Sequence, residues 1–168
     1  MKTSRYDDET FFEKYGQMDR SRLGLAGAGE WETLEPLLQA GQDVLILAFS
    51  SGLSVTAGNA RLAAQELHEA FPDRRVEVVD SLCASMGEGL FCYHVAKKRR
   101  AGATLEETRR YAEELKLRLC HWFTVDDLHF LKRGGRVSST AAVLGTMLGI
   151  KPVLHVDDEG HLIPVSKV

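Results

Sequence analysis

A cluster of cations and glycines has the composition of an anion-binding loop. It consists of Lys132, Arg133, Gly134, Gly135 and Arg136. A short helical pattern over residues 126–131 leads into it, and the two glycines predict a tight turn, since glycine reaches positive φ without steric cost. Ser138 is expected to cap a second helix ending near Leu148. Cations beside a helix N-terminus attract anions, although the same pattern is typical of a solvated basic turn.

Hydroxyl side chains gather directly after a continuous apolar run, residues 44–49. They are Ser50, Ser51, Ser54 and Thr56. Six apolar residues without alternation predict a strand buried on both faces, as in a parallel sheet between helices. Ligands bind at the carboxyl edge of such sheets, and Ser54 or Thr56 would lie at the start of the next helix. We expect a cradle for a carboxylate or phosphate; the alternative is that Ser54 only caps the helix.

The elements that must position these two loops follow from the hydrophobic pattern. Residues 21–30 are expected to form a loop, with a short helix beginning at Thr33. Helices are predicted to about Ala70, over residues 86–100, and from a capping box of Thr104 and Glu107. Strands are predicted at residues 76–79, 121–125, 150–156 and 161–165, the last two as a hairpin. Asp80 closes the second strand as a turn former or a catalytic acid. The fold class is therefore α/β, a mainly parallel sheet flanked by helices.

Composition restricts the classes of function. The 168 residues carry a net charge of −3, which argues against nucleic acid as the main partner, and 44% of them are hydrophobic, enough for a core. Three cysteines without C-x-x-C spacing predict a reducing, cytoplasmic location and no metal site. The charged N-terminus predicts no signal peptide. No Ser/His/Asp set and no G-x-S-x-G elbow is visible, so the residues alone do not indicate an enzyme.

Several motifs together resemble the DegV family of bacterial fatty-acid-binding proteins. They are FTVDDL at residues 123–128, LKRGGRVS at 131–138, and LG at 144–145 followed by LGIKP at 148–152. The Ser50–Ser54 stretch is similar to the serine loop of that family, and Asp80 with Ser81 is similar to its strand-end Asp-Ser/Thr pair. The matched segments extend over about residues 44–168.

The resemblance implies a two-domain carrier, not an enzyme. Residues 1–120 would form a DegV-type N-terminal α/β domain lacking the first strand, and residues 121–168 the start of the second, lipid-binding domain. A long-chain fatty acid would lie between the domains, and no other cofactor is implied. Ser54 matches the carboxylate-binding serine, with Ser51, Thr56 and Ser21 as further hydroxyl candidates.

A protein partner is implied as well. A fatty acid kinase of the dihydroxyacetone-kinase type would phosphorylate the bound acid for phospholipid synthesis. Arg136 matches an arginine of the family's Gly-Gly-Arg loop, which is implicated in function together with this kinase. The same loop contains Lys132, Arg133, Gly134 and Gly135. Transient membrane contact is compatible with this role.

The chain also departs from the family pattern. Residues 23–26 replace the family's Thr-Ser-Gln-Pro segment, and Val55 replaces a glycine after the second loop serine. The chain is expected to be truncated at both ends, which would expose apolar surface and favour homo-oligomers. Two alternatives therefore remain: a non-binding relative with a regulatory or interaction role, and a hydrolase or phosphotransferase on the same scaffold.

Overall fold

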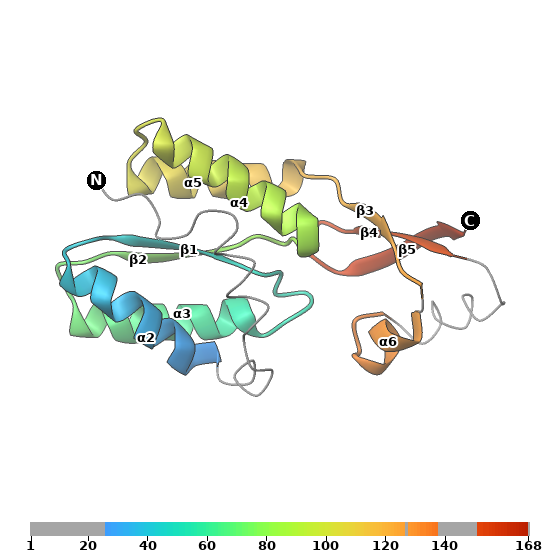
Figure 1. Cartoon of the computed structure of the whole chain (residues 1–168), viewed down its shortest axis with the longest axis horizontal. Helices are drawn as coiled ribbons and strands as arrows, with labels where there is room; N and C mark the ends of the chain where they lie inside the picture. The colour runs from blue at the N-terminus through green and yellow to red at the C-terminus, as the bar shows by residue number, and fades with distance from the viewer. Residues whose placement is uncertain (1–25, 127, 138–150, 168) are drawn as a thin grey trace.

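A computed structural model describes residues 26–126, 128–137 and 151–167 of the chain (Figure 1). The expected Ser138 helix and the hydroxyl of Ser21 lie outside these residues. The described elements are, in chain order, α2 (Ala26–Gln39), β1 (Val44–Ala48), α3 (Thr56–Ala70), β2 (Val76–Asp80), α4 (Ser85–Arg100), α5 (Leu105–Leu115), η2 (Lys116–Arg118), β3 (Trp122–Thr124), α6 (Leu128–Arg133), β4 (Pro152–Val156) and β5 (Leu162–Lys167).

Strands β1 and β2 pair in parallel and lie between two helical layers. Their register joins Val44 to Val76 and Ala48 to Asp80, so both strands end at the same edge. Helices α2 and α3 cover one face, and α4 and α5 cover the other (Figure 1). Ile46 packs toward the first pair of helices and Leu45 toward the second. This two-sided burial confirms the interpretation of the unbroken apolar run.

Helix α2 is longer than the sequence pattern predicts. We expected a loop up to residue 30 and a helix start at Thr33, but α2 begins at Ala26 and contains both Thr33 and Pro36. Proline removes one intrahelical hydrogen bond. The helix nevertheless continues to Gln39 because Leu34 and Leu38 are buried against α3. Tertiary packing thus overrides the local preference.

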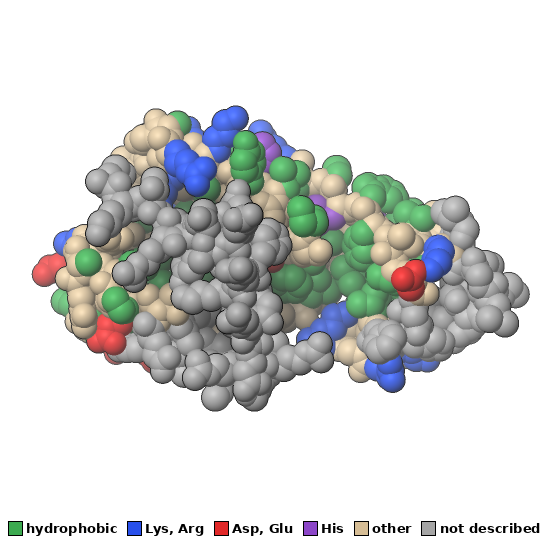
Figure 2. Space-filling model, in the orientation of Figure 1, with side chains coloured by type: hydrophobic (Ala, Val, Ile, Leu, Met, Phe, Trp, Pro, Cys, Tyr) green, Lys and Arg blue, Asp and Glu red, His purple; other side chains and the backbone are tan. Residues whose placement is uncertain are grey.

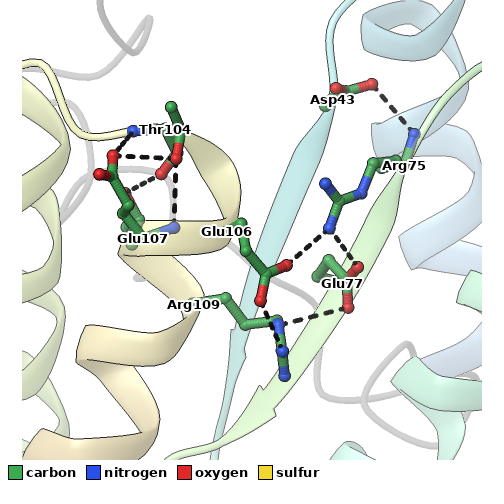
Figure 3. A network of polar contacts seen from close by, with 8 residues as sticks. Asp43, Arg75, Glu77, Thr104, Glu106, Glu107 and Arg109 are labelled. Atoms are coloured by element: carbon green, nitrogen blue, oxygen red, sulfur yellow. Dashed lines mark hydrogen bonds and ion pairs between the residues drawn. The ribbon is translucent and has the colours of Figure 1, made fainter.

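Helix α5 is attached to β2 by charged side chains (Figure 3). Arg75 donates to Glu77 at 3.0 Å and to Glu106 at 2.9 Å, and Arg109 donates to Glu106 at 2.9 Å. The backbone N–H of Arg75 also donates to Asp43 at 3.0 Å. This network links α5, β2 and the start of β1 at the surface, so it contributes to the packing of the helical layer.

The three later strands form a separate antiparallel sheet in the order β3-β4-β5. The α/β class is confirmed, but the expectation of a mainly parallel sheet is wrong for the described strands, because parallel pairing is confined to β1 and β2. The short turn between β4 and β5 permits only antiparallel pairing. One face of this sheet packs Leu154 and Leu162 with Leu128 of α6, whereas Trp122 of β3 is 61% exposed.

Apolar side chains reach the surface of α4 and of the antiparallel sheet. Met86, Leu90 and Tyr93 share one side of α4, and Trp122 and Val165 extend from the sheet. Figure 2 shows apolar side chains over the region of the sheet. The exposure expected from truncation, and association through it, stay predictions. In the described part of the chain, no helix is long and apolar enough to cross a membrane.

Candidate functional site

Two hydroxyl groups meet at the start of α3. Ser54 Oγ lies 2.7 Å from Thr56 Oγ1 and also accepts the backbone N–H of Thr56 at 3.3 Å. One hydroxyl must donate to the other, so the pair retains one O–H that can donate to a third group. The pair lies at the N-terminus of a 15-residue helix, where unpaired N–H groups favour an anion. Val55 occupies the N-cap position without a side-chain cap, so the Ser54 hydroxyl, which accepts the N–H of the first helical residue, is compatible with both a capping role and a ligand role.

Val55 between them does not disturb this arrangement. Its φ is −75°, a value that any residue adopts, and its side chain is 75% exposed. The glycine expected at this place from the family pattern is therefore not required by the backbone. Ser51 differs from Ser54, because its side chain is exposed and shares no hydrogen bond with the pair in the described structure.

Asp80 holds the hydroxyl loop from the neighbouring strand. It is 7% exposed, and its Oδ1 accepts the backbone N–H groups of Ser51 and Leu82, each at 3.2 Å. Its Oδ2 lies 3.9 Å from Arg61. These contacts support the turn-forming interpretation over that of a catalytic acid. The sequence showed Asp80 at a strand end but not which loop it would bind.

The turn between β4 and β5 packs on the same loop. Ser50 is fully buried and donates its hydroxyl to Gly160 O at 2.8 Å. A Cβ on Gly52 would lie 2.7 Å from Gly160 O, and a Cβ on Gly160 would lie 2.1 Å from Ser50 Oγ. Both glycines therefore permit a close approach of two backbones. No local sequence signal joins residues 50 and 160, so this contact was missed.

Arg136 brings the two predicted anion-binding loops together. Its Nε donates to the carbonyl oxygen of Leu53 at 2.9 Å, and its Nη1 donates to that of Gly134. Gly135 adopts φ +74° and ends the α6 turn through its N–H bond to Lys132 O at 2.9 Å. The predicted glycine turn is thus confirmed. Lys132 and Arg133 are exposed and form the last turn of α6.

Two cysteines of this part of the chain, the buried Cys83 and the half-buried Cys92, have raised thiol pKa values. Burial, followed by the negative charge of Glu88, raises the pKa of Cys83 to about 12 and that of Cys92 to about 11. Both groups are therefore protonated at neutral pH, and only a thiolate attacks or binds a metal well. Burial also raises the pKa of Glu88 to about 7. Among the described residues, no group of three or more His, Cys, Asp or Glu side chains could hold a metal ion.

His121 precedes β3 and is a residue that the sequence did not single out. Both of its ring nitrogens are buried without a hydrogen-bond partner. Its ring lies over Gly87 at the start of α4, where a Cβ would approach Cδ2 to 2.6 Å. Burial lowers the pKa of His121, so the ring is neutral and acts here as packing between α4 and the start of the second sheet.

Comparisons with known proteins identify the family and the fold of the chain. A family model described as an uncharacterised protein of the DegV family matches residues 28–168. A DegV domain-containing protein of Clostridium perfringens is 46% identical over 136 residues, which cover 81% of this chain and 47% of the relative. The chain spans about half the length of the curated relatives it matches.

Solved structures of similar fold are described as lipid-bound proteins. A structure from Thermus thermophilus, described as fatty acid binding of a DegV family protein, has a TM-score of 0.72 and 35% identity, covering 84% of this chain and 49% of the other. The fatty acid kinase B3 protein of Streptococcus pneumoniae, loaded with linoleic acid, has a TM-score of 0.67. It is 23% identical, and the match covers 75% of this chain and 45% of that protein. By its sequence, its loops and its fold, the chain belongs to the DegV family.

Proposed function

We propose that this chain binds the carboxylate of a long-chain fatty acid and acts as a carrier, not as an enzyme. The observation that carries the proposal is the Ser54–Thr56 hydroxyl pair at the N-terminus of α3, at the carboxyl edge of a parallel strand pair. The fatty acid binding described for the Thermus relative supports the choice of ligand. Ser51 and Ser21 remain secondary candidates for the same site.

The physical chemistry of the pair suits a carboxylate. A hydroxyl donor and the α3 dipole stabilise the negative charge of a carboxylate, so the protein needs no buried cation beside it. Burying such a cation would cost several kcal/mol in desolvation. A hydrogen bond to a charged group contributes about 1.5–3 kcal/mol. Donors of this kind fix one end of the ligand, while apolar surface takes up the acyl chain.

The wider role adds a kinase partner and a two-domain arrangement. The kinase partner is a fatty acid kinase of the dihydroxyacetone-kinase type, for which the exposed loop of Lys132, Arg133 and Arg136 is the proposed contact. Two domains, with a boundary near residue 120, would place the ligand between the parallel pair and the antiparallel sheet. Within the described residues these two sheets share no strand, which supports such a boundary.

The test is direct binding of a fatty acid to the 168-residue protein. Organic extraction and mass spectrometry should recover fatty acid in molar proportion, and Ser54→Ala should weaken binding of added oleate about 10- to 100-fold, as the loss of one charged hydrogen bond predicts. Ser166→Ala, an exposed change on β5, is the matched control. A wild-type protein that carries no lipid and takes up none would contradict the carrier and favour the non-binding relative.

A further inference from the structure

We propose that Arg136 is a positioning residue that shapes the carboxylate site by holding the backbone of the Ser54 loop. The inference rests on the proposed function, because it concerns the same site. Its basis is the hydrogen bond from Arg136 Nε to Leu53 O at 2.9 Å. The peptide that contains this carbonyl is the one that joins Leu53 to Ser54, so its orientation sets where the Ser54 side chain begins.

Three residues of the hydroxyl loop, Ser50, Ser51 and Leu53, are held from outside their own segment, and Ser50 also donates its N–H to Cys83 O at 3.1 Å. Asp80 binds the N–H of Ser51, and Gly160 accepts the hydroxyl of Ser50. Arg136 binds the third residue, which is the one next to Ser54. The N–H side of the Leu53–Ser54 peptide donates to Ser50 O at 3.1 Å within the loop, and Arg136 holds the carbonyl side of the same peptide.

The packing around Leu53 reinforces this role. The Leu53 side chain is 8% exposed and lies in a core cluster with Val137, the residue that follows Arg136. The side chain of Leu53 and its carbonyl are therefore held by adjacent residues of the segment that follows α6. The apolar contact restricts the position of Leu53, and the hydrogen bond restricts the rotation of its peptide.

The guanidinium group makes this bond in a fixed geometry. In the described structure both acceptors of Arg136 are neutral carbonyl oxygens, Leu53 O and Gly134 O. A planar guanidinium can donate hydrogen bonds to two carbonyl oxygens at once because its N–H groups point in fixed directions. Lysine carries the same charge, but all its N–H donors are on one nitrogen without the planar geometry of a guanidinium. It would therefore restore the bond to Leu53 only in part.

This role predicts an effect that is specific for the head group. Arg136→Ala should weaken binding of oleate about 10-fold and leave binding of oleyl alcohol, which has the same chain without a carboxylate, within about 2-fold. Arg136→Lys should fall between Arg136→Ala and the wild type. Arg100→Ala, which removes an exposed cation at the end of α4, is the charge-matched control and should match the wild type.

Hydrogen exchange reports the positioning itself. Arg136→Ala should accelerate exchange of the backbone amides of residues 51–54, whereas Ser54→Ala should leave these rates nearly unchanged while it weakens oleate binding. If Arg136 acts through Ser54, its replacement should also have a smaller effect on oleate affinity when Ser54 is already alanine. Circular dichroism melting of each variant verifies that the chain is folded.

Three results would overturn the inference. Exchange rates unchanged in Arg136→Ala would show that the loop does not need this bond. Equal losses for oleate and oleyl alcohol would indicate a general structural defect. Additive effects of the two replacements would indicate that Arg136 acts independently of Ser54. If the unmodified protein binds no oleate, the proposed function fails together with the carboxylate role of Arg136, and the exchange rates alone then decide whether Arg136 holds the loop.

Discussion

Replacing Gly160 with alanine should destabilise the protein because two costs coincide at this position. Gly160 has φ +82°, and a Cβ there would lie 2.1 Å from Ser50 Oγ. The left-handed conformation costs a non-glycine residue about 1–2 kcal/mol. Displacing the buried Ser50 hydroxyl from Gly160 O adds about 1–3 kcal/mol for an unsatisfied pair. We therefore expect the free energy of unfolding to fall by about 3 kcal/mol.

The chain offers a control that separates these two costs. Gly102 has φ +96°, and nothing lies within 4 Å of an added Cβ. Gly102→Ala should therefore lower the free energy of unfolding by only about 1–2 kcal/mol, the backbone part alone. Urea unfolding followed by circular dichroism gives both values under the same conditions.

A double-mutant cycle identifies the contact responsible. Ser50→Ala removes the nearest atom that the new Cβ would meet and leaves the longer contacts with Leu82. Gly160→Ala should therefore cost about 1–2 kcal/mol less in that background than in the wild type. Equal costs for Gly160→Ala and Gly102→Ala, or no coupling between residues 50 and 160, would refute the packing of the β4–β5 turn on the hydroxyl loop.

Two further predictions concern the helices that cover the parallel strands. Thr104→Ala removes the hydroxyl that accepts the N–H of Glu107, while the backbone N–H of residue 104 can still donate to the Glu107 carboxylate. The loss of the hydroxyl should lower the free energy of unfolding by about 1 kcal/mol in urea titrations; an unchanged midpoint would count against the cap. Burial raises the pKa of Glu88 to about 7, so the folded state binds its proton more tightly than the unfolded chain and stability should fall as pH rises from about 4.5 to about 7. Glu88→Gln should flatten this part of the pH dependence and stabilise the protein at pH 8, and an unaltered slope would argue that Glu88 is not the titrating group.

The sequence predicted those helices and strands whose pattern lies within a few consecutive residues. The apolar run before Ser50, the α3 helix to Ala70 and the capping box at Thr104 all appear in the structure as expected. Such signals need only the chain near them, because burial on two faces and a side chain that caps a helix are properties of a few consecutive residues. The start of α2 was predicted wrongly from the local pattern, because contacts of Leu34 and Leu38 with α3 outweigh the effect of Pro36 on the helix.

The sequence by itself determined the chemistry of the two loops: hydroxyls after β1, cations and glycines after α6. Only the tertiary structure decided how they meet. Arg136 reaches Leu53 across 83 positions, and Ser50 reaches Gly160 across 110. No local pattern encodes such contacts, since they depend on how the antiparallel sheet packs against the edge of the parallel strands. Residue types limit which bonds can form, and packing between distant segments selects the bonds that do form.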